Sequence, residues 1–573
     1  MNHELARPRS LFQRPARSYH ATSRRHGDVF DNVLIHGDNL LALKAIESSM
    51  RGRVKCIYID PPFNTLQALE YYDDGVEHSI WLSLMRERLS ILRNLLTTDG
   101  TIFIHIDDNE LAYLTVLCDE IFGRENRAYI VTFKQGSATG HKSINPGCVS
   151  TTNFILVYAK DRSMWTPNRV YSARDRDLRY NQYITNVSSS FKEWQVVPLM
   201  TAFADSNGLL EREARKLVKD NPELLDNFVM SNARNVIRWA QPDYDAVGKD
   251  IKKAIDDSRA SPRVWHIVER ADHDDLFIRD GQRALFYASK LKLIDGVYVS
   301  GEPLTTLWDD LLSNNLHKEG GVHFPKGKKP EALIKRCIEL STTPGDIVLD
   351  SFAGSGTTGA VAHKMGRRWV MVELKDHCET HIAPRMNSVV DGTDRSGITE
   401  AVGWEGGGGY RYYRLAPSLM EKDAFGQWVI SPAYNAEMLA KAICVHFGFT
   451  YAPHPEHYWM QGRSSETDFI YVTTNSLTHE QLKVISEEVG PERTLLICCK
   501  AFQGAKVDSF ANLTVRKIPG AVLDRCEWGK DDYSLKIANL PMAEDELELE
   551  PTSKASAKAD PAQSNLFAPE GAK

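Results

Sequence analysis

Residues 347–359 read IVLDSFAGSGTTG, an apolar strand that runs into a glycine-rich turn and then into a helix. Glycines let the backbone pass close to a ligand, and the N-terminus of a helix that begins near Thr357 favours an anionic group. A carboxylate, Glu373, follows about 20 residues further on, where it can bind ribose hydroxyls. The stretch therefore predicts a nucleoside pocket. Because its G-x-G-x-x-G spacing also satisfies the dinucleotide fingerprint, the stretch alone leaves an oxidoreductase and a methyltransferase open.

The surrounding sequence alternates apolar strands with helices in two separate stretches. The first stretch predicts strands at 33–35, 54–59 and 101–106 and helices at 40–46 and 80–96. The second begins at Pro330 and predicts a helix at 332–340 and strands at 347–349 and 369–372. This alternation is typical of a parallel α/β sheet. One sheet could be built from both stretches.

A second motif, Asp60-Pro61-Pro62-Phe63, ends the apolar strand at 54–59. Ligands bind at such strand ends. An aromatic amine is a poor nucleophile, so an enzyme must draw its hydrogens to acceptors, and the Asp60 carboxylate and the Pro61 carbonyl could be those acceptors. Consecutive prolines fix the backbone and remove competing donors, and Phe63 can stack on a base flipped out of a duplex. Together the two motifs predict a nucleoside cofactor and a base substrate.

This pair of motifs resembles the amino-methyltransferases of DNA. In that family the catalytic motif is Asp-Pro-Pro-aromatic and the cofactor loop is Phe-x-Gly-x-Gly. The catalytic motif precedes the cofactor loop here, which is the order of the family's permuted β group. The resemblance implies a Rossmann-like, circularly permuted α/β sheet that depends on S-adenosylmethionine, with an inserted target-recognition domain and a small C-terminal α/β domain.

Further segments are similar to the modification subunits of type III restriction systems. They are Ile102–Glu110 and Gly407–Tyr413, and the resemblance covers about 30–160 and 300–415. It implies methylation of adenine N6 in double-stranded DNA, a homodimer and a separate restriction subunit with helicase and nuclease activity. Asp before Pro-Pro favours adenine in the family, but the same acceptors would serve the N4 amine of cytosine. A catalytically idle DNA-binding specificity subunit is the alternative of another class, and the intact catalytic motif argues against it.

The resemblance also implies which residues hold the cofactor. His36–Asn39 resembles a segment that completes the cofactor pocket in the permuted order, and Phe324–Glu331 resembles the motif just upstream of the cofactor loop. The predicted cofactor contacts are Asp38, Lys329, Asp350, Phe352, Gly354, Ser355, Gly356, Thr357, Thr358 and Glu373. No metal is predicted, because His377 and His381 lie one helical turn apart without the glutamate of a metalloprotease pattern.

Changes in composition, together with the resemblance, imply six parts along the chain. They are a disordered basic arm (1–29), the catalytic half of the methyltransferase domain (30–134), a target-recognition domain (135–300), the cofactor-binding half (301–403), a C-terminal α/β interaction domain that follows a glycine hinge (404–540) and a disordered acidic tail (541–573). We expect that deletion of residues 135–300 abolishes sequence-specific methylation.

The bulk properties limit the class of protein. The chain has 573 residues, enough for several packed domains. It contains no run of about 18 apolar residues, and its Arg-rich start lacks the apolar segment of a secretory signal, so we expect a cytoplasmic protein without membrane contact. The nine cysteines are odd in number and scattered, which favours reduced core residues over disulfides. A net charge of −7 means that any DNA contact must come from a local basic surface.

Two sets of residues are candidates for contacts with macromolecules. Phosphates and bases could be contacted by Lys134, Gln135, Lys142, Arg174, Arg176, Arg179, Tyr180 and Tyr183, although a solvated charged face would look the same. Gln563, Leu566 and Phe567 in the tail are similar to the peptides with which bacterial proteins dock on the replication sliding clamp. An apolar pair in such a polar tail suits a docking peptide, and chance would also produce so short a match.

Overall fold

The computed structural model describes residues 11–23, 25, 27–64, 77–136, 147–271, 273–311, 316–324, 327–416, 420–422, 428–430, 434–502 and 510–518. Within these ranges, no helix is both long enough and apolar enough to span a membrane.

An 11-stranded sheet forms the centre of the molecule, with the strand order β1-β20-β3-β19-β18-β4-β5-β7-β6-β17 and β2 paired to β20. Its strands are β1 (Leu11–Gln13), β2 (Tyr19–His20), β3 (Asn32–His36), β4 (Val54–Ile59), β5 (Leu96–Ile106), β6 (Arg127–Lys134), β7 (Thr152–Ala159), β17 (Leu307–Trp308), β18 (Ile347–Asp350), β19 (Arg368–Glu373) and β20 (Gly409–Leu415).

The parallel core of this sheet joins strands from the two stretches of the chain. β18 pairs with β19 on one side and with β4 on the other, and β3 pairs with β19 and β20. All of β18 and nearly all of β4 are buried, as expected for parallel strands that helices cover on both faces. The prediction that both stretches contribute to one parallel sheet is confirmed.

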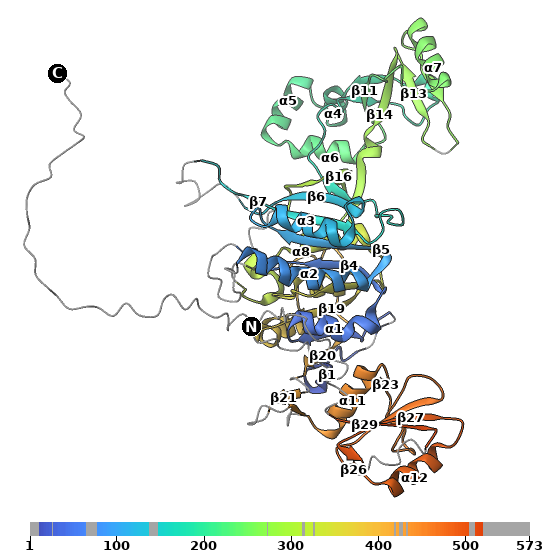
Figure 1. Cartoon of the computed structure of the whole chain (residues 1–573). Helices are drawn as coiled ribbons and strands as arrows, with labels where there is room; N and C mark the ends of the chain where they lie inside the picture. The colour runs from blue at the N-terminus through green and yellow to red at the C-terminus, as the bar shows by residue number, and fades with distance from the viewer. Residues whose placement is uncertain are drawn as a thin grey trace, which may run out of the picture. The chain divides into compact units, whose positions relative to one another are not determined.

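Helices cover this sheet in two layers (Figure 1). α1 (Asn39–Met50), α2 (His78–Leu95) and α3 (Leu111–Phe122) pack on one another, as do α8 (Glu331–Ser341), α9 (Thr357–Lys364) and α10 (Ala383–Val390). The path β3-α1-β4-α2-β5 crosses the sheet in one direction and β18-α9-β19 in the other. Because parallel crossovers are right-handed, the two sets of helices lie on opposite faces.

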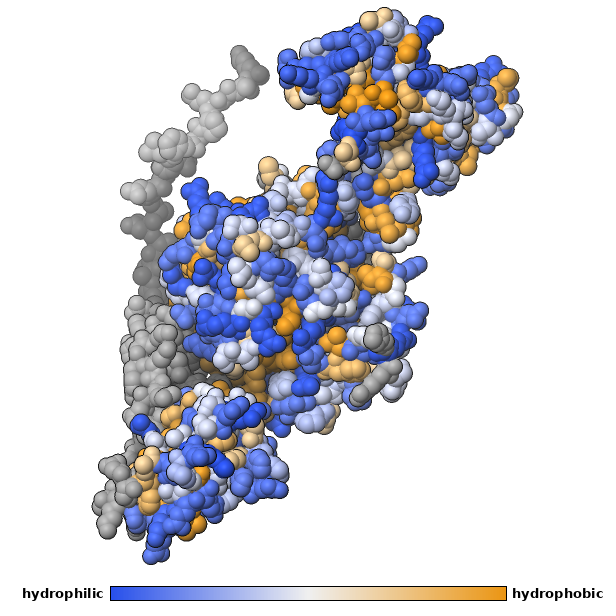
Figure 2. Space-filling view, turned by 90° about the vertical axis from the view of Figure 1, so that its right-hand side faces the viewer, coloured by the Kyte–Doolittle hydropathy of each residue, from blue (hydrophilic) through white to orange (hydrophobic). Residues whose placement is uncertain are grey.

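One face of the molecule is mainly hydrophilic in its described residues (Figure 2). On the face in Figure 2, hydrophobic side chains form separate small patches among hydrophilic ones. Large apolar residues such as Tyr58, Phe103 and Trp369 are buried in the core around the main sheet. Scattered apolar surface of this kind is normal for a folded protein.

The inserted domain starts later than its predicted boundary at residue 135. β7 pairs antiparallel with both β5 and β6, so Thr152–Ala159 belongs to the main sheet. This strand was not expected from sequence, because β7 pairs antiparallel with β5 and β6 and so does not follow the alternation of parallel strands and helices. The insert itself begins near β8 and ends near β16.

The insert contains a six-stranded sheet, β10-β9-β11-β14-β13-β12, and a three-stranded sheet, β15-β16-β8. Its elements are β8 (Tyr171–Ala173), β9 (Gln182–Ile184), β10 (Val196–Pro198), α4 (Leu199–Ser206), α5 (Glu211–Asp220), α6 (Glu223–Ser231), β11 (Val236–Ala240), α7 (Lys249–Ala260), β12 (His266–Val268), β13 (Leu276–Arg279), β14 (Gln282–Phe286), β15 (Leu291–Ile294) and β16 (Val297–Pro303).

The described residues after β20 form a small α/β fold. Its elements are β21 (Met420–Lys422), β22 (Trp428–Ile430), α11 (Ala436–Phe447), β23 (Thr450–Tyr451), β24 (Gly462–Arg463), β25 (Asp468–Val472), β26 (Ser476–Leu477), α12 (His479–Val489), β27 (Thr494–Cys499), β28 (Ala501–Phe502) and β29 (Leu513–Lys517). The parallel strands β25, β27 and β29 lie side by side. A capping box of Thr478 and Gln481 starts α12.

Two segments that the sequence pattern assigned elsewhere join the main sheet. β1 and β2 fall within the predicted disordered arm (1–29), yet both pair with the edge of β20. β20 falls within the predicted C-terminal domain (404–540), yet it pairs in parallel with β3. The run before β20 is packed and is no hinge, since a Cβ on Gly408 would lie 2.7 Å from the Val29 carbonyl oxygen. Residues 1–10 and the tail 541–573 lie outside the described residues.

Candidate active site

The two sequence motifs meet at one edge of the main sheet. Asp60 directly follows β4, and Asp350 is the last residue of the neighbouring parallel strand β18. Val348 and Leu349 lie opposite Cys56 and Ile57 in register, so both strands end at the same edge. Ligands of open α/β sheets bind at the carboxyl ends of the strands.

The two carboxylate oxygens of Asp60 have different surroundings. Oδ2 lies 2.7 Å from Lys329 Nζ. Oδ1 is buried and has no hydrogen-bond partner among the described residues. Burial raises the pKa of Asp60, and the ammonium of Lys329 opposes that rise. Asp60 therefore has one occupied and one vacant acceptor.

The backbone that follows Asp60 is held by α2. Trp81 Nε1 donates a hydrogen bond to the Pro62 carbonyl at 2.9 Å. The Phe63 ring lies 5.6 Å from the imidazole of His105, centroid to centroid, and Lys329 Nζ lies 4.9 Å from the centroid of the same ring. These contacts fix the loop and the place of its aromatic ring.

The imidazole of His105 packs against the Phe63 ring. It is fully buried in β5 and contacts Tyr58 Oη at 3.0 Å and Asn153 Nδ2 at 3.1 Å. Burial lowers the pKa of His105 well below its ordinary value, so the ring is uncharged. Because the Asn153 amide donates to Nε2, Nδ1 carries the proton and donates to Tyr58.

Asn64, the residue after the Asp60–Phe63 motif, donates a hydrogen bond to the buried carboxylate of Glu110. Asn64 has a φ of 59°, in the left-handed region that Asn tolerates. Its amide donates to Glu110 Oε1 at 2.8 Å, and His78 Nδ1 lies 2.9 Å from Glu110 Oε2. Sequence patterns did not single out Asn64, His78, Trp81 or Glu110, since their partners come from other elements.

The glycine-rich loop is organised by the Asp350 carboxylate. Oδ1 accepts from the Phe352 backbone N–H at 2.9 Å, and Oδ2 accepts from Thr358 Oγ1 at 2.6 Å. Burial raises the pKa of Asp350 to about 7, with smaller contributions from the charges of Asp60 and Glu373. Asp350 therefore shapes the turn from inside.

Glu373 reaches the same turn from the end of β19. It accepts from the Gly354 N–H at 2.7 Å and from the Leu374 N–H at 2.8 Å, and His377 Nε2 lies 3.0 Å away. Gly356 has a φ of 76°, and a Cβ there would lie 2.9 Å from Ile382. The turn thus needs glycine, and the carboxylate that the sequence assigned to ribose lies against it.

The segment at the start of α1 completes this edge of the sheet. The Asn39 amide donates to the Ser351 carbonyl at 2.9 Å, and Arg88 Nε donates to Asn39 Oδ1 at 2.6 Å. Asp38 caps α1 by accepting from the Leu41 N–H. The structure therefore places Asn39, which follows Asp38, against the glycine-rich loop, and the cofactor contact of Asp38 stays a prediction.

Ser355 and Thr357 face a buried network of charges. Arg385 donates to Thr357 Oγ1 at 2.8 Å and pairs with Glu331 at 2.7 Å. Lys364 lies 2.8 Å from Glu331. The alternating charges compensate one another inside the protein, as buried charges require. This network contacts the glycine-rich loop through the hydrogen bond from Arg385 to Thr357.

The comparison with known proteins agrees with this geometry. A family model described as DNA methylase matches residues 54–383, more than half of the chain. The chain belongs to this DNA methylase family.

Two curated relatives of this methylase carry type III names. The chain is 35% identical over 419 residues to the probable type III restriction-modification enzyme HindVI Mod subunit of Haemophilus influenzae. The match covers 69% of this chain and 55% of the relative. The chain is 28% identical over 412 residues to the EcoPI Mod subunit of Escherichia phage P1, covering 63% and 58%. The chain thus spans about half the length of these relatives.

Solved structures of DNA methyltransferases also match at low identity. The M1.HpyAVI–SAM complex has 14% identity and a TM-score of 0.30, covering 62% of this chain and 99% of that one. PvuII DNA methyltransferase, which is cytosine-N4-specific, has 14% identity and a TM-score of 0.30, covering 67% and 97%.

Lys329 contacts the Asp60–Phe63 motif. The resemblance grouped it with the cofactor contacts, which stays a prediction, and the structure places its ammonium on Asp60 and over Phe63. Sequence alone could not show this, because the backbone around Pro330 sets the direction of the side chain.

No metal cluster is present among the described residues of the methylase. His377 pairs with Glu373, and His381 Nε2 lies 3.1 Å from the His323 carbonyl. Both histidines flank or belong to a short π-helix, Cys378–Ile382.

Most candidate DNA contacts in the insert have partners inside the protein. Arg176 pairs with Asp226 at 2.5 Å and Arg179 with Asp177 at 2.7 Å. Tyr180 is buried, and Tyr183 stacks on Phe228. Arg174 likewise lies 3.3 Å from Asp309. Lys142 lies outside the described residues.

Proposed function

We propose that this protein is a site-specific DNA methyltransferase that transfers a methyl group from S-adenosylmethionine to N6 of adenine in double-stranded DNA. The observation that carries the proposal is the vacant, buried Oδ1 of Asp60 at a strand end beside the glycine-rich loop. A buried acceptor without a partner is costly unless a ligand satisfies it. The amine of a flipped base is such a ligand.

The chemistry follows from the groups at the strand end. Asp60 Oδ1 accepts one hydrogen of the amine and the Pro61 carbonyl accepts the other, which directs the nitrogen lone pair toward the methyl donor. The Pro62 carbonyl does not compete, because Trp81 occupies it. Phe63 stacks on the base. The N–C bond forms as the S–C bond of the sulfonium breaks, and the amine loses one proton.

The residues around the loop fit S-adenosylmethionine. Two glycines of this turn, Gly354 and Gly356, have positive φ, and a Cβ on Gly356 would lie 2.9 Å from Ile382, so the turn keeps a conformation that glycine favours. Glu373 and Asp350 place carboxylates at the ends of adjacent strands. In this proposal Glu373 binds the ribose hydroxyls, Asp38 completes the pocket, and the cofactor supplies an electrophilic methyl group.

DNA binding is assigned to the insert. Arg238 on β11 and Arg283 on β14 share one face of its larger sheet, since Arg238 lies opposite Leu285 and Ala240 opposite Arg283. Their Nε atoms are buried and have no hydrogen-bond partner in the described part of the chain, and the Arg238 guanidinium lies 5.4 Å from the centroid of the Tyr180 ring. These two arginines join the insert residues chosen from sequence as candidate phosphate contacts.

The names of the relatives support a biological setting. Several are Mod subunits of type III restriction-modification enzymes. We propose that this chain is such a subunit or a relative that acts alone, that its sheet is circularly permuted, and that it works as a homodimer with an optional restriction subunit. Clamp docking by Gln563, Leu566 and Phe567 stays a prediction from sequence, because these residues lie outside the described ranges.

The decisive experiment is methyl transfer to DNA. The wild-type protein is incubated with tritiated S-adenosylmethionine and unmethylated genomic DNA, and the product nucleosides are separated. We expect label in N6-methyladenine. Asp60→Ala should reduce transfer about a hundredfold or more, because an acceptor that acts at the reacting nitrogen is lost. Its binding of cofactor and DNA should match wild type.

Asp108→Ala is the matched control, since Asp108 is an exposed carboxylate just beyond the neighbouring strand β5. It should transfer methyl groups as wild type does. Label in N4-methylcytosine would overturn the choice of adenine. DNA binding without any transfer would favour the idle specificity subunit.

A further inference from the structure

Asp60 is held on one side only. Lys329 Nζ lies 2.7 Å from Oδ2, whereas Oδ1 is buried without a partner among the described residues. The ion pair is nearly enclosed, since the two side chains are 12% and 18% exposed. Solvent therefore screens it weakly, and its geometry is better defined than that of a surface pair.

The direction of the Lys329 side chain is set by its own segment. Pro330 follows it and restricts the backbone of the preceding residue to extended conformations. The adjacent Lys328 points elsewhere and donates to the Glu319 and Val322 carbonyls. The two consecutive lysines thus contact different groups, and of the two only Lys329 contacts the Asp60–Phe63 loop.

Lys329 also contacts the aromatic ring of the motif. Its Nζ lies 4.9 Å from the Phe63 centroid, a cation–π distance. One ammonium therefore touches both side chains of the catalytic loop that the proposed function uses. It comes from the opposite end of the methylase domain in sequence, just before α8.

We propose that Lys329 is a positioning residue for methyl transfer: it holds Asp60 by Oδ2, so that Oδ1 alone faces the amine of the target base, and it fixes the Phe63 ring. The inference rests on the proposed function. Lys329 forms no bond with the substrate. The positive charge of Lys329 opposes the rise that burial causes in the pKa of Asp60, and it therefore favours the carboxylate.

Removal of the positive charge has a definite consequence. Burial raises the pKa of Asp60, and Lys329 is the group that lowers it. Without Lys329 the pKa rises further, so a larger fraction of Asp60 is protonated at neutral pH. A protonated Asp60 has lost an acceptor, and activity falls. Higher pH restores the carboxylate, so the acidic limb of the kcat profile should move to higher pH.

The experiment compares Lys329→Met and Lys329→Arg with wild type in the full-length protein. Initial rates are measured from pH 6 to pH 9, together with the Kd of S-adenosylmethionine. We expect Lys329→Met to lose about tenfold or more in kcat at pH 7 and to regain much of it at high pH, since one pKa unit changes the ionised fraction about tenfold. The Kd should stay within about twofold, and Lys329→Arg should restore most of the activity.

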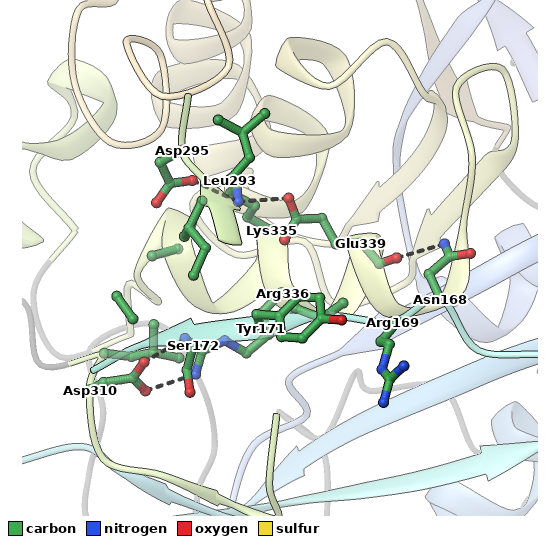
Figure 3. A pocket seen from close by; sticks show the side chains of 15 residues that line it. Asn168, Arg169, Tyr171, Ser172, Leu293, Asp295, Asp310, Lys335, Arg336 and Glu339 are labelled. Carbon is green, nitrogen blue, oxygen red and sulfur yellow. Dashed lines mark hydrogen bonds and ion pairs between the residues drawn. The ribbon is translucent and has the colours of Figure 1, made fainter. Parts of the chain in front are cut away.

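Lys335→Met is the matched control. Lys335 is buried to a similar degree, 14% exposed, and pairs with Asp295 at 2.9 Å and Glu339 at 2.7 Å (Figure 3). It lies on α8 in a cavity of about 650 Å³ near the root of the insert. This variant loses an ion-paired lysine without touching the catalytic loop, so its pH profile should match wild type.

The outcomes separate the inference from the proposed function. A Lys329→Met profile that is lowered but not shifted would overturn the positioning role. A weakened cofactor Kd with an unshifted profile would assign Lys329 to the cofactor, which also overturns it. If Lys329→Met does not fold, Lys329→Gln, which keeps a donor without charge, is measured in its place. Absence of transfer by wild type would refute the proposed function itself.

Discussion

The indole of Trp81 on α2 donates a hydrogen bond to the Asp60–Phe63 loop. Trp81→Phe keeps the buried ring but leaves the Pro62 carbonyl without its donor. An unsatisfied acceptor of this kind costs about 1–3 kcal/mol. We expect kcat to fall about tenfold as the loop loses its geometry, with the Kd of the cofactor unchanged. Steady-state kinetics and cofactor titration measure the two effects.

Trp308→Phe serves as the control for that change. Its indole is also buried and donates to a backbone carbonyl, that of Thr305, at 2.8 Å on β17. Both variants should lose similar stability in thermal unfolding. Equal kcat values for the two variants would show that the bond to Pro62 has only a structural role.

At the residue scale, sequence predicted Asp60 and Phe63 as site residues. A carboxylate, two prolines and an aromatic ring in succession after a buried strand are an uncommon combination for a turn that has only a structural role. Trp81 could not be found, because an indole on a regular helix looks like an ordinary core residue, and His105 and Glu110 were named only within the segment Ile102–Glu110, without a role of their own. Only the contacts across elements show that they surround the loop.

At the scale of elements, β20 depends on the glycines before it. Gly408 has a φ of 73°, and a Cβ there would meet the Val29 carbonyl oxygen at 2.7 Å. We expect Gly408→Ala to lower the free energy of unfolding by about 1–3 kcal/mol, since both strain and contact oppose the methyl group. Chemical denaturation measures this change.

Gly366→Ala isolates the contact from the strain. Gly366 has a φ of 70°, close to that of Gly408, but a Cβ on Gly366 would meet no neighbouring atom within 4 Å. It should be the milder substitution. If the two variants are equally destabilised, β20 is not packed as tightly against Val29 as the structure indicates.

The elements that sequence missed share one physical cause. The strands at 54–59 and 347–350 are apolar because helices bury both faces, and that pattern is visible in sequence. β1 and β2 are only three and two residues long, and both pair with β20. Pairing with a distant edge strand leaves no periodic signal in the strand itself.

At the scale of the whole molecule, the insert leaves the methylase fold through two paired strands. β8 and β16 are antiparallel, with Ala173 opposite Gly301. Joining these residues with an Asn-Gly turn removes 174–300 and closes a hairpin. We expect a folded protein that binds S-adenosylmethionine but no longer methylates a specific site. Deletion of 135–300 would also remove β7 from the main sheet and is the poorer test.

Cofactor titration and sequencing of modified DNA check this prediction. If the shortened protein still methylates the wild-type sequence, DNA recognition does not reside in the insert. If it binds no cofactor, the excision has damaged the methylase fold, and a longer turn at the same junction repeats the test.

The pairing of β4 with β18, a strand far along the chain, also affects folding during synthesis. β4 has its final neighbour only when β18 leaves the ribosome, roughly 290 residues later in the sequence. At about 5–20 residues per second, the nascent chain carries an apolar, unpaired strand edge for roughly 15–60 s. An exposed edge of this kind invites aggregation. Translation speed and chaperone supply should therefore govern the yield of this protein more strongly than its final stability does.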